Sequence, residues 1–232
     1  MKSLLKFPLL VAVATMMTCS FSACSDNDDP TPDTGTSETD AKFEAIAKQY
    51  LDHTVYVTYK NLADETEQLV KDLQALKSSK TDANVKATCE TFLEARAWWE
   101  KSEAFLYGAA TDFGIDPHID SWPLDLDGLQ TALKNTEQVE AMGGEDGDIY
   151  AGEKLGNSLL GFHGIEYILF EDGSPKSVSK ISDLHLTYAV AVAGDLRNRC
   201  WQLELSWRGE SAVNADRVAK VANELELPYT VN

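Results

Sequence analysis

The sequence predicts an all-α fold, a bundle of long antiparallel helices with one ordered loop bounded by proline and glycine. Apolar residues recur at spacings of three and four over most of the chain beyond residue 41, as in helices that bury one face. No segment of useful length alternates apolar and polar residues as a half-buried strand does. Gly114, Pro117 and Pro123 interrupt the helical pattern, so this segment is expected to be an irregular loop.

Residues 1–23 have the features of an export signal. Lys2 and Lys6 give a basic start, and the apolar run of about a dozen residues that follows is too short to span a bilayer. The run ends in Phe-Ser-Ala-Cys, which resembles a bacterial lipobox and implies that Cys24 is lipidated and becomes the mature N-terminus. We therefore expect a lipoprotein signal peptide and a protein anchored to a membrane of the bacterial cell envelope.

Residues 24–40 are expected to form an acidic flexible tether, since they carry six acidic and no basic side chains. Acidic residues directly after a lipidated cysteine resemble an outer-membrane sorting signal, so an outer-membrane lipoprotein on the periplasmic or the exposed face is expected. Residues 41–232 should form the folded domain, with 32 acidic and 18 basic side chains. Such a charge repels nucleic acid and favours cations, although a solvated surface without a partner agrees with it equally well.

The helical pattern of this domain falls into successive segments. The first, with Phe43, Ile46 and Tyr50 on its apolar face, is one helix or two with a bend. Thr81 or Asp82 can cap the second. Helices are expected over about residues 41–77, 82–108, 126–142, 157–170 and 182–205, with a short amphipathic helix over 211–225. An acidic loop through Asp148 should lead into the fourth.

The segment 157–170 is almost wholly apolar, yet it contains His163 and Glu166. In a helix these two residues share a face, and burying them requires a metal, an opposite charge or hydrogen bonds. Gly161 and Gly164 each cost about 1 kcal/mol of helix propensity relative to alanine. They leave room beside the histidine for another backbone or a ligand. A satisfied core histidine and a functional one both remain open.

Two other segments carry unusual polar residues. Arg96, Trp99 and Glu103 fall on one stripe of the second helix, where an internal Arg–Glu pair is the simpler interpretation. In the loop, Asp120 and Ser121 precede Trp122, whose bulk is expected to anchor the loop against the bundle.

Two cysteines, Cys89 and Cys200, remain in the domain. They could pair in an oxidising compartment, which their spacing does not decide.

These motifs together resemble the imelysin family of bacterial envelope proteins. Gly161–Glu166 matches its G-x-H-x-x-E signature, Arg96–Gly108 resembles its Arg/Trp/Ser-Glu-Ala-Phe helix, and Ile119–Pro123 matches its Ile-Asp-Ser-Trp-Pro loop. The likeness covers about residues 41–208. It implies a helical-bundle protein, often a lipoprotein, linked to iron uptake and once classed as a metallopeptidase. It also implies one site formed by the matched residues. The family usually adds a second bundle, most of which this chain is expected to lack.

A peptidase would need three metal ligands and a bound water. No His-Glu-x-x-His is present, and the inverted motif would need histidine where Tyr167 stands. Binding without catalysis needs less, since one imidazole and several carboxylates suit iron or another divalent metal such as zinc. The predicted ligands are His163, Glu166 and Glu103, with Asp120 as a possible fourth.

Arg96 is expected to balance charge behind these ligands, and Trp99, Ser121 and Trp122 to support them. The expected function is that of a lipid-anchored metal-binding component of iron acquisition. Its partners would be the membrane, through the lipid on Cys24, and iron-uptake transport components. The alternative is a structural or interaction module in which His163 and Glu166 only hydrogen-bond with Arg96 and Ser121 and lock the helices together. A metallopeptidase is the less favoured third possibility.

Overall fold

The computed structural model describes residues 37–230, which fall into two units, one ending at Lys42 and one beginning at Phe43. The predicted signal peptide, Cys24 and most of the predicted tether lie outside the described residues. The last residues of that tether, from Glu38, are helical.

The all-α prediction is confirmed. The helices are α1 (Glu38–Tyr50), α2 (Tyr56–Ser78), α3 (Asp82–Ser102), α4 (Ala109–Asp112), α5 (Asp116–Asp120), α6 (Leu126–Lys134), α7 (Thr136–Met142), α8 (Gly147–Lys154), α9 (Gly161–Leu169), α10 (Asp183–Arg208) and α11 (Ala215–Ala219). Turns of π-helix, η1 (Leu51–Val55) and η6 (Lys220–Glu224), follow α1 and α11. Strands β1 (Phe170–Glu171) and β2 (Ser174–Pro175) form a small antiparallel hairpin.

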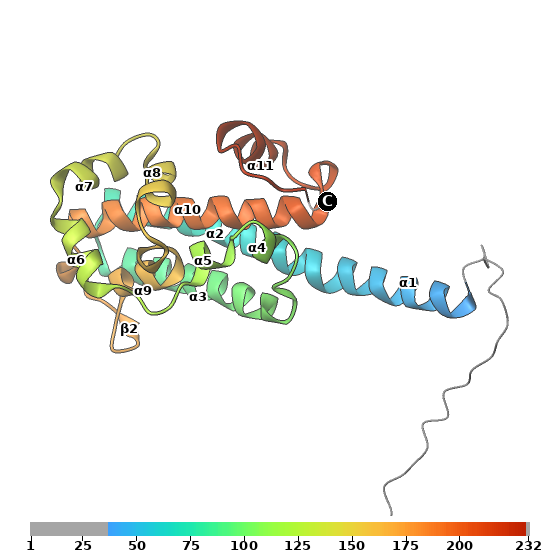
Figure 1. The fold of residues 1–232 in the computed structure, drawn as a ribbon. Helices are drawn as coiled ribbons and strands as arrows, with labels where there is room; N and C mark the ends of the chain where they lie inside the picture. The colour runs from blue at the N-terminus through green and yellow to red at the C-terminus, as the bar shows by residue number, and fades with distance from the viewer. Residues whose placement is uncertain (1–36, 231–232) are drawn as a thin grey trace, which may run out of the picture. The chain divides into compact units, whose positions relative to one another are not determined.

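Three long helices, α2, α3 and α10, make the centre of the bundle (Figure 1), with α2 packed against both of the others. The short connection between α2 and α3 makes them antiparallel. Lys80, just after α2, pairs with Asp183 at the start of α10 at 2.9 Å, so α10 also runs antiparallel to α2. Buried Leu62, Leu69 and Leu203 are among the side chains that fill the space between them.

Local capping explains where several helices begin. Thr81 caps α3, as expected, by accepting a hydrogen bond from the backbone N–H of Asn84. The helix predicted over residues 126–142 is instead two helices, because Asn135 ends α6 and caps α7 through the N–H of Gln138. The segment predicted to be an irregular loop, residues 112–126, contains the short helix α5 and follows α4, and α8 begins at the end of the predicted acidic loop.

The apolar face predicted for the first helix is not covered. Phe43 and Ile46 are 66% and 62% exposed, and α1 contains no buried residue. Periodicity therefore predicted the helix correctly but not its burial. Cys89 and Cys200 are buried free thiols. Within residues 37–230, none of the helices is both long and apolar enough to cross a bilayer.

Two glycines of α9 allow close approaches, Gly161 to α5 and Gly164 to Tyr188 of α10. Gly161 has φ +67°, and a Cβ there would lie 2.1 Å from the carbonyl oxygen of Ile119. A Cβ at Gly164 would lie 2.4 Å from the hydroxyl of Tyr188, which donates a hydrogen bond to the carbonyl of Leu159. The expectation that these glycines admit another backbone is confirmed for Gly161, and it explains why α9 can start against the end of α5.

Gly161→Ala is expected to lower the free energy of unfolding by roughly 2–3 kcal/mol, because it adds both backbone strain and a clash with a backbone oxygen. Gly156 is the matched control, since its φ is −70° and a Cβ there would meet open space. Urea denaturation followed by circular dichroism measures both variants. Equal stability of the two variants would contradict the role assigned to the close approach.

Candidate functional site

Asp120, the last residue of α5, is the centre of a polar cluster formed by α3, α5 and α9. Its Oδ2 accepts a hydrogen bond from Trp99 Nε1 at 2.9 Å, and its Oδ1 accepts one from the Arg96 guanidinium. The same Oδ1 lies 3.0 Å from His163 Nε2. The side chain of Asp120 is only 14% exposed. Both of its carboxylate oxygens are in contact with polar groups of the protein.

His163 contacts a carboxylate through each ring nitrogen. Nε2 faces Asp120, and Nδ1 lies 3.3 Å from Glu166 Oε2. A neutral imidazole has one N–H, so it can donate to only one of these carboxylates. The second contact brings a nitrogen lone pair towards a negatively charged oxygen unless a positive species lies there. Either a second proton on the ring or a bound cation satisfies this arrangement.

The Glu166 side of His163 is open. The Glu166 side chain is 54% exposed, and the Trp122 ring lies 4.7 Å from the His163 ring, centroid to centroid. Trp122 itself is 74% exposed, so the expectation that it anchors the loop against the bundle is wrong. The Trp122 ring instead covers His163. The loop is held by Asp120 and by the close approach of the Ile119 carbonyl to Gly161. A cavity of about 450 Å³ begins here, lined by Trp122, His163, Glu166 and by Phe92, Phe170, Glu171 and Asp172.

The structure brings together most, but not all, of the predicted site. Arg96, Trp99, Asp120 and His163 are in direct contact. Glu103 lies in the single turn after α3, and its side chain makes no hydrogen bond or ion pair with any described residue.

Ser121 likewise makes no side-chain hydrogen bond to residues 37–230. Across that range, no three His, Cys, Asp or Glu side chains are grouped so that they could hold a metal ion. The four-ligand set therefore stays a prediction, and only His163 and Glu166 have the position that it requires.

The charges around Asp120 perturb two carboxyl groups in opposite directions. Burial alone would raise the pKa of Asp120, but hydrogen bonds from Arg96 and Trp99 outweigh it, and the pKa is lowered. Partial burial and the neighbouring charges of Glu100 and Asp120 raise the pKa of Glu103. Arg96 is itself held by Glu100 at 2.6 Å and lies over the Phe162 ring. Asp120 is thus an ionised, well-anchored partner for His163.

Acid should weaken the fold through Asp120. Because its folded pKa lies below the unfolded value of about 3.9, its stabilising contribution is complete above that pH and is lost as the pH falls through the folded pKa. Asp120→Asn is expected to lower the free energy of unfolding by about 2 kcal/mol at pH 7. It should also reduce the slope of stability against pH below pH 4. Urea titrations from pH 7 to pH 3 measure both, and parallel curves for the two proteins would refute this role.

The donor set fits a transition-metal site in part. A metal-binding histidine commonly has a carboxylate beside its other ring nitrogen that fixes the ring, and Asp120 lies 3.0 Å from Nε2. His163 Nδ1 and Glu166 then form an imidazole and carboxylate pair at i and i+3, which helical bundles use as ligands. The residues therefore fit two positions of an open site, with Asp120 as a positioning residue.

A second half-buried histidine was missed by the sequence reasoning. His118 points away from the site, and its Nδ1 lies 3.1 Å from Asp195 Oδ2 of α10. Asp195 is 4% exposed and also faces Arg199. The only signal in the sequence is that His118 lies two residues before Asp120. In a short helix, this spacing puts the two side chains on different faces. The His118–Asp195 pair attaches α5 to α10 and so holds Asp120 in place.

Comparison with known proteins identifies the fold and its family. The sequence model of the family described as Imelysin (Peptidase_M75) matches residues 55–227. Iron-regulated protein A of Synechococcus elongatus is 31% identical over 163 residues, which cover 70% of this chain and 40% of that protein.

Two solved structures are similar. One, described as an iron-regulated protein A precursor from Parabacteroides distasonis, has a TM-score of 0.65 and 25% identity, over 84% of this chain and 54% of that chain. The other, an imelysin peptidase from Bacteroides ovatus, has a TM-score of 0.52 and 33% identity, over 60% and 39%. The chain thus spans about half the length of these relatives or less. The resemblance seen in the three sequence motifs is confirmed, and this chain belongs to the imelysin family.

Proposed function

We propose that this protein is a lipid-anchored component of iron acquisition in the bacterial cell envelope, in which His163 and Glu166 bind an iron ion. The lipobox ending at Cys24 supports the anchor, and the outer membrane is the membrane that the acidic residues after it favour. Iron-uptake transport components are the partners that this role implies. Two relatives carry the description iron-regulated protein A, which supports a role connected with iron.

The observation that carries the proposal is the double carboxylate contact of His163. Asp120, anchored by Arg96 and Trp99, holds Nε2, and this leaves Nδ1 directed to Glu166 on the exposed side. A cation between Nδ1 and Glu166 removes the repulsion between the lone pair and the carboxylate. His163 and Glu166 would hold the ion beside the cavity, and water or ligands carried by the metal would complete its coordination.

A structural role for the cluster is the second candidate. It is favoured by the saturation of Asp120, whose two oxygens are already bound by Arg96, Trp99 and His163. In this alternative a second proton on His163 replaces the metal, and the cluster only ties α3, α5 and α9 together. The two candidates differ in one measurable quantity, the metal content.

The test is metal analysis of the full chain purified from membranes in detergent, after anaerobic loading with Fe(II) and, separately, with Zn(II). About one metal ion per chain after gel filtration is expected. Absence of bound metal under every loading condition would reject iron binding and leave the structural role.

A further inference from the structure

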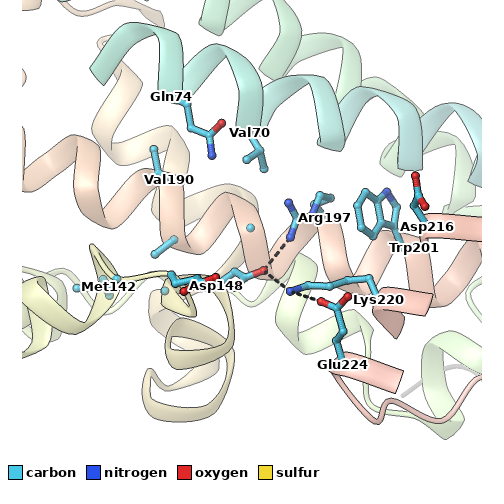
Figure 2. A pocket seen from close by; sticks show the side chains of 15 residues that line it. Val70, Gln74, Met142, Asp148, Val190, Arg197, Trp201, Asp216, Lys220 and Glu224 are labelled. Carbon is cyan, nitrogen blue, oxygen red and sulfur yellow. Dashed lines mark hydrogen bonds and ion pairs between the residues drawn. The ribbon is translucent and has the colours of Figure 1, made fainter. Parts of the chain in front are cut away.

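A second cavity, of about 400 Å³, lies between α2, α8, α10 and the C-terminal segment (Figure 2). It shares no lining residue with the cavity beside His163. Its size is at the lower end of the range for small-molecule sites. The walls divide into an apolar part, a polar part and an acidic rim, and each part limits the kind of molecule that can bind.

The polar wall is a row of four alternating charges. Arg197 Nη2 contacts Asp148 Oδ2 at 2.7 Å, and Lys220 Nζ lies 3.8 Å from the same oxygen and 3.3 Å from Glu224 Oε2. Figure 2 shows this row along the cavity, with Arg197 between Asp148 and the α2 side chains. Because both cations approach one oxygen of Asp148, their donor groups lie next to each other.

Arg197 and Lys220 keep unused hydrogen-bond donors in this wall, and the exposed Glu224 carboxylate at its end keeps unused acceptors. Arg197 uses Nε and Nη2 on Asn198 and Asp148, whereas its Nη1 has no hydrogen-bond acceptor among residues 37–230. The Lys220 ammonium likewise makes ion pairs but no hydrogen bond in that part of the chain. The Asp148 carboxylate already accepts three hydrogen bonds, on Oδ1 from Ile149 N–H and on Oδ2 from Arg197 and Asn198.

The charge of Arg197 is also incompletely compensated. Burial lowers its pKa, and the opposing effects of Asp148 and Glu67 do not restore the ordinary value. An additional negative group near Nη1 would therefore be stabilised, in agreement with the free donors.

The other walls limit the rest of the ligand. The side chains of Val70, Met142 and Val190 face the cavity. Gly194 also lines it, and a larger residue does not fit there, since a Cβ would lie 2.5 Å from Asp148 Cβ. An apolar body fits against them. Glu145, Asp216 and Glu224 are exposed lining residues and form an acidic rim, which would repel a ligand with several negative charges.

We propose that this cavity binds a monocarboxylate with a short aliphatic body, its carboxylate on Arg197 Nη1 and Lys220 Nζ and its body against Val70 and Val190. Such a ligand uses both free donors with a single charge and covers the apolar wall. The site is separate from the His163 cluster, so it can exist whether or not that cluster binds metal.

Isothermal titration calorimetry of the full chain with three probes tests this proposal. The probes are 4-methylpentanoate, 3-methylbutylammonium, which has a similar body and the opposite charge, and propane-1,2,3-tricarboxylate. One site for 4-methylpentanoate is expected, with no binding of the amine and at least about tenfold weaker binding of the tricarboxylate. No binding of 4-methylpentanoate, or tighter binding of either other probe, would overturn the proposal.

Variants locate the binding. Lys220→Gln and Arg197→Gln are each expected to weaken 4-methylpentanoate binding about tenfold or more, as for a lost charge-assisted hydrogen bond. Lys220 lies on the C-terminal turn, so its variant remains informative if Arg197→Gln does not fold. Lys154→Gln, an exposed lysine paired with Glu153, is the matched control and should bind as the wild type does. Unchanged affinity of Lys220→Gln would place the probe elsewhere.

Discussion

His163→Ala is expected to weaken Fe(II) or Zn(II) binding by about a hundredfold or more while the fold is retained. Loss of an outer partner of a metal ligand commonly costs ten- to a hundredfold in affinity, and loss of one of only two protein ligands should cost at least as much. The fold should survive because the ring is at the edge of the core and contacts Trp122, which is itself exposed. Anaerobic titration calorimetry measures the affinity, and circular dichroism checks the fold. His53→Ala, an exposed histidine in η1, is the matched control.

Three further variants assign the roles of the carboxylates. Glu166→Gln should weaken binding about as much as His163→Ala, whereas Asp120→Asn should weaken it by roughly ten- to a hundredfold, as expected for a positioning residue. Glu103→Gln tests whether the metal is bound by His163 and Glu166 alone, as the structure suggests, or also by Glu103, as the four-ligand prediction requires. Unchanged affinity is expected, because Glu103 contacts neither His163 nor Glu166 among the described residues. A strong loss of metal affinity in Glu103→Gln would show that metal binding rearranges the turn after α3. An unchanged metal affinity in His163→Ala would refute the proposed site at His163 and Glu166.

Arg217→Met is expected to lower the free energy of unfolding by about 3 kcal/mol at pH 7. Arg217 of α11 binds Asp64 and Glu67 of α2 at 2.7 and 2.8 Å and Glu204 of α10 at 2.8 Å. Glu204 is 2% exposed, so removal of Arg217 leaves a buried carboxylate with Arg208 as its remaining cation. Breaking a buried ion pair by removal of one partner commonly costs 3–5 kcal/mol, and the retained Arg208 places the expected value at the lower end.

Urea denaturation at pH 7 measures this loss. Lys60→Met is the control, because the Lys60–Asp64 pair is on the surface and should contribute only about 0.5 kcal/mol. The double variant Glu204→Gln/Arg217→Met should recover part of the stability, since it removes the uncompensated charge. A loss in Arg217→Met no larger than in Lys60→Met would show that the cluster contributes no more than a surface pair.

The elements that the sequence predicted well depend on local physics. Apolar spacing predicted the long helices, since one helix face must be buried whatever its partner is. The cap at Thr81 and the interruption of the helical pattern at Gly114, Pro117 and Pro123 depend on backbone groups within a few residues. Asn135 shows where this reasoning failed, because the apolar pattern continues across it although its side chain ends one helix and begins another.

The candidate site was predicted only as a set of residues. The spacing of Arg96 and Trp99 correctly places them on one side of α3, but Glu103 lies beyond the end of the helix, and spacing within a helix does not fix the rotation of α3 relative to α5. The structure directs Arg96 and Trp99 to Asp120 and leaves Glu103 aside. Trp122 shows the same limit, because a bulky apolar residue can lie against a functional side chain in solvent as well as in a core.

The sequence by itself determined the long helices and the motifs of the family, and it indicated that Gly161 leaves room for another backbone or a ligand, because each depends on neighbouring residues or on a motif. The tertiary structure alone decided that Asp120 positions His163, that His118 pairs with Asp195, and that Arg217 binds residues of two other helices. Asp195 is 77 residues from His118, and Asp64 is 153 residues from Arg217. Such ion pairs form where packed helices bring charged side chains together away from solvent. The packing of the helices depends on all the residues of the core, so local sequence does not predict these pairs.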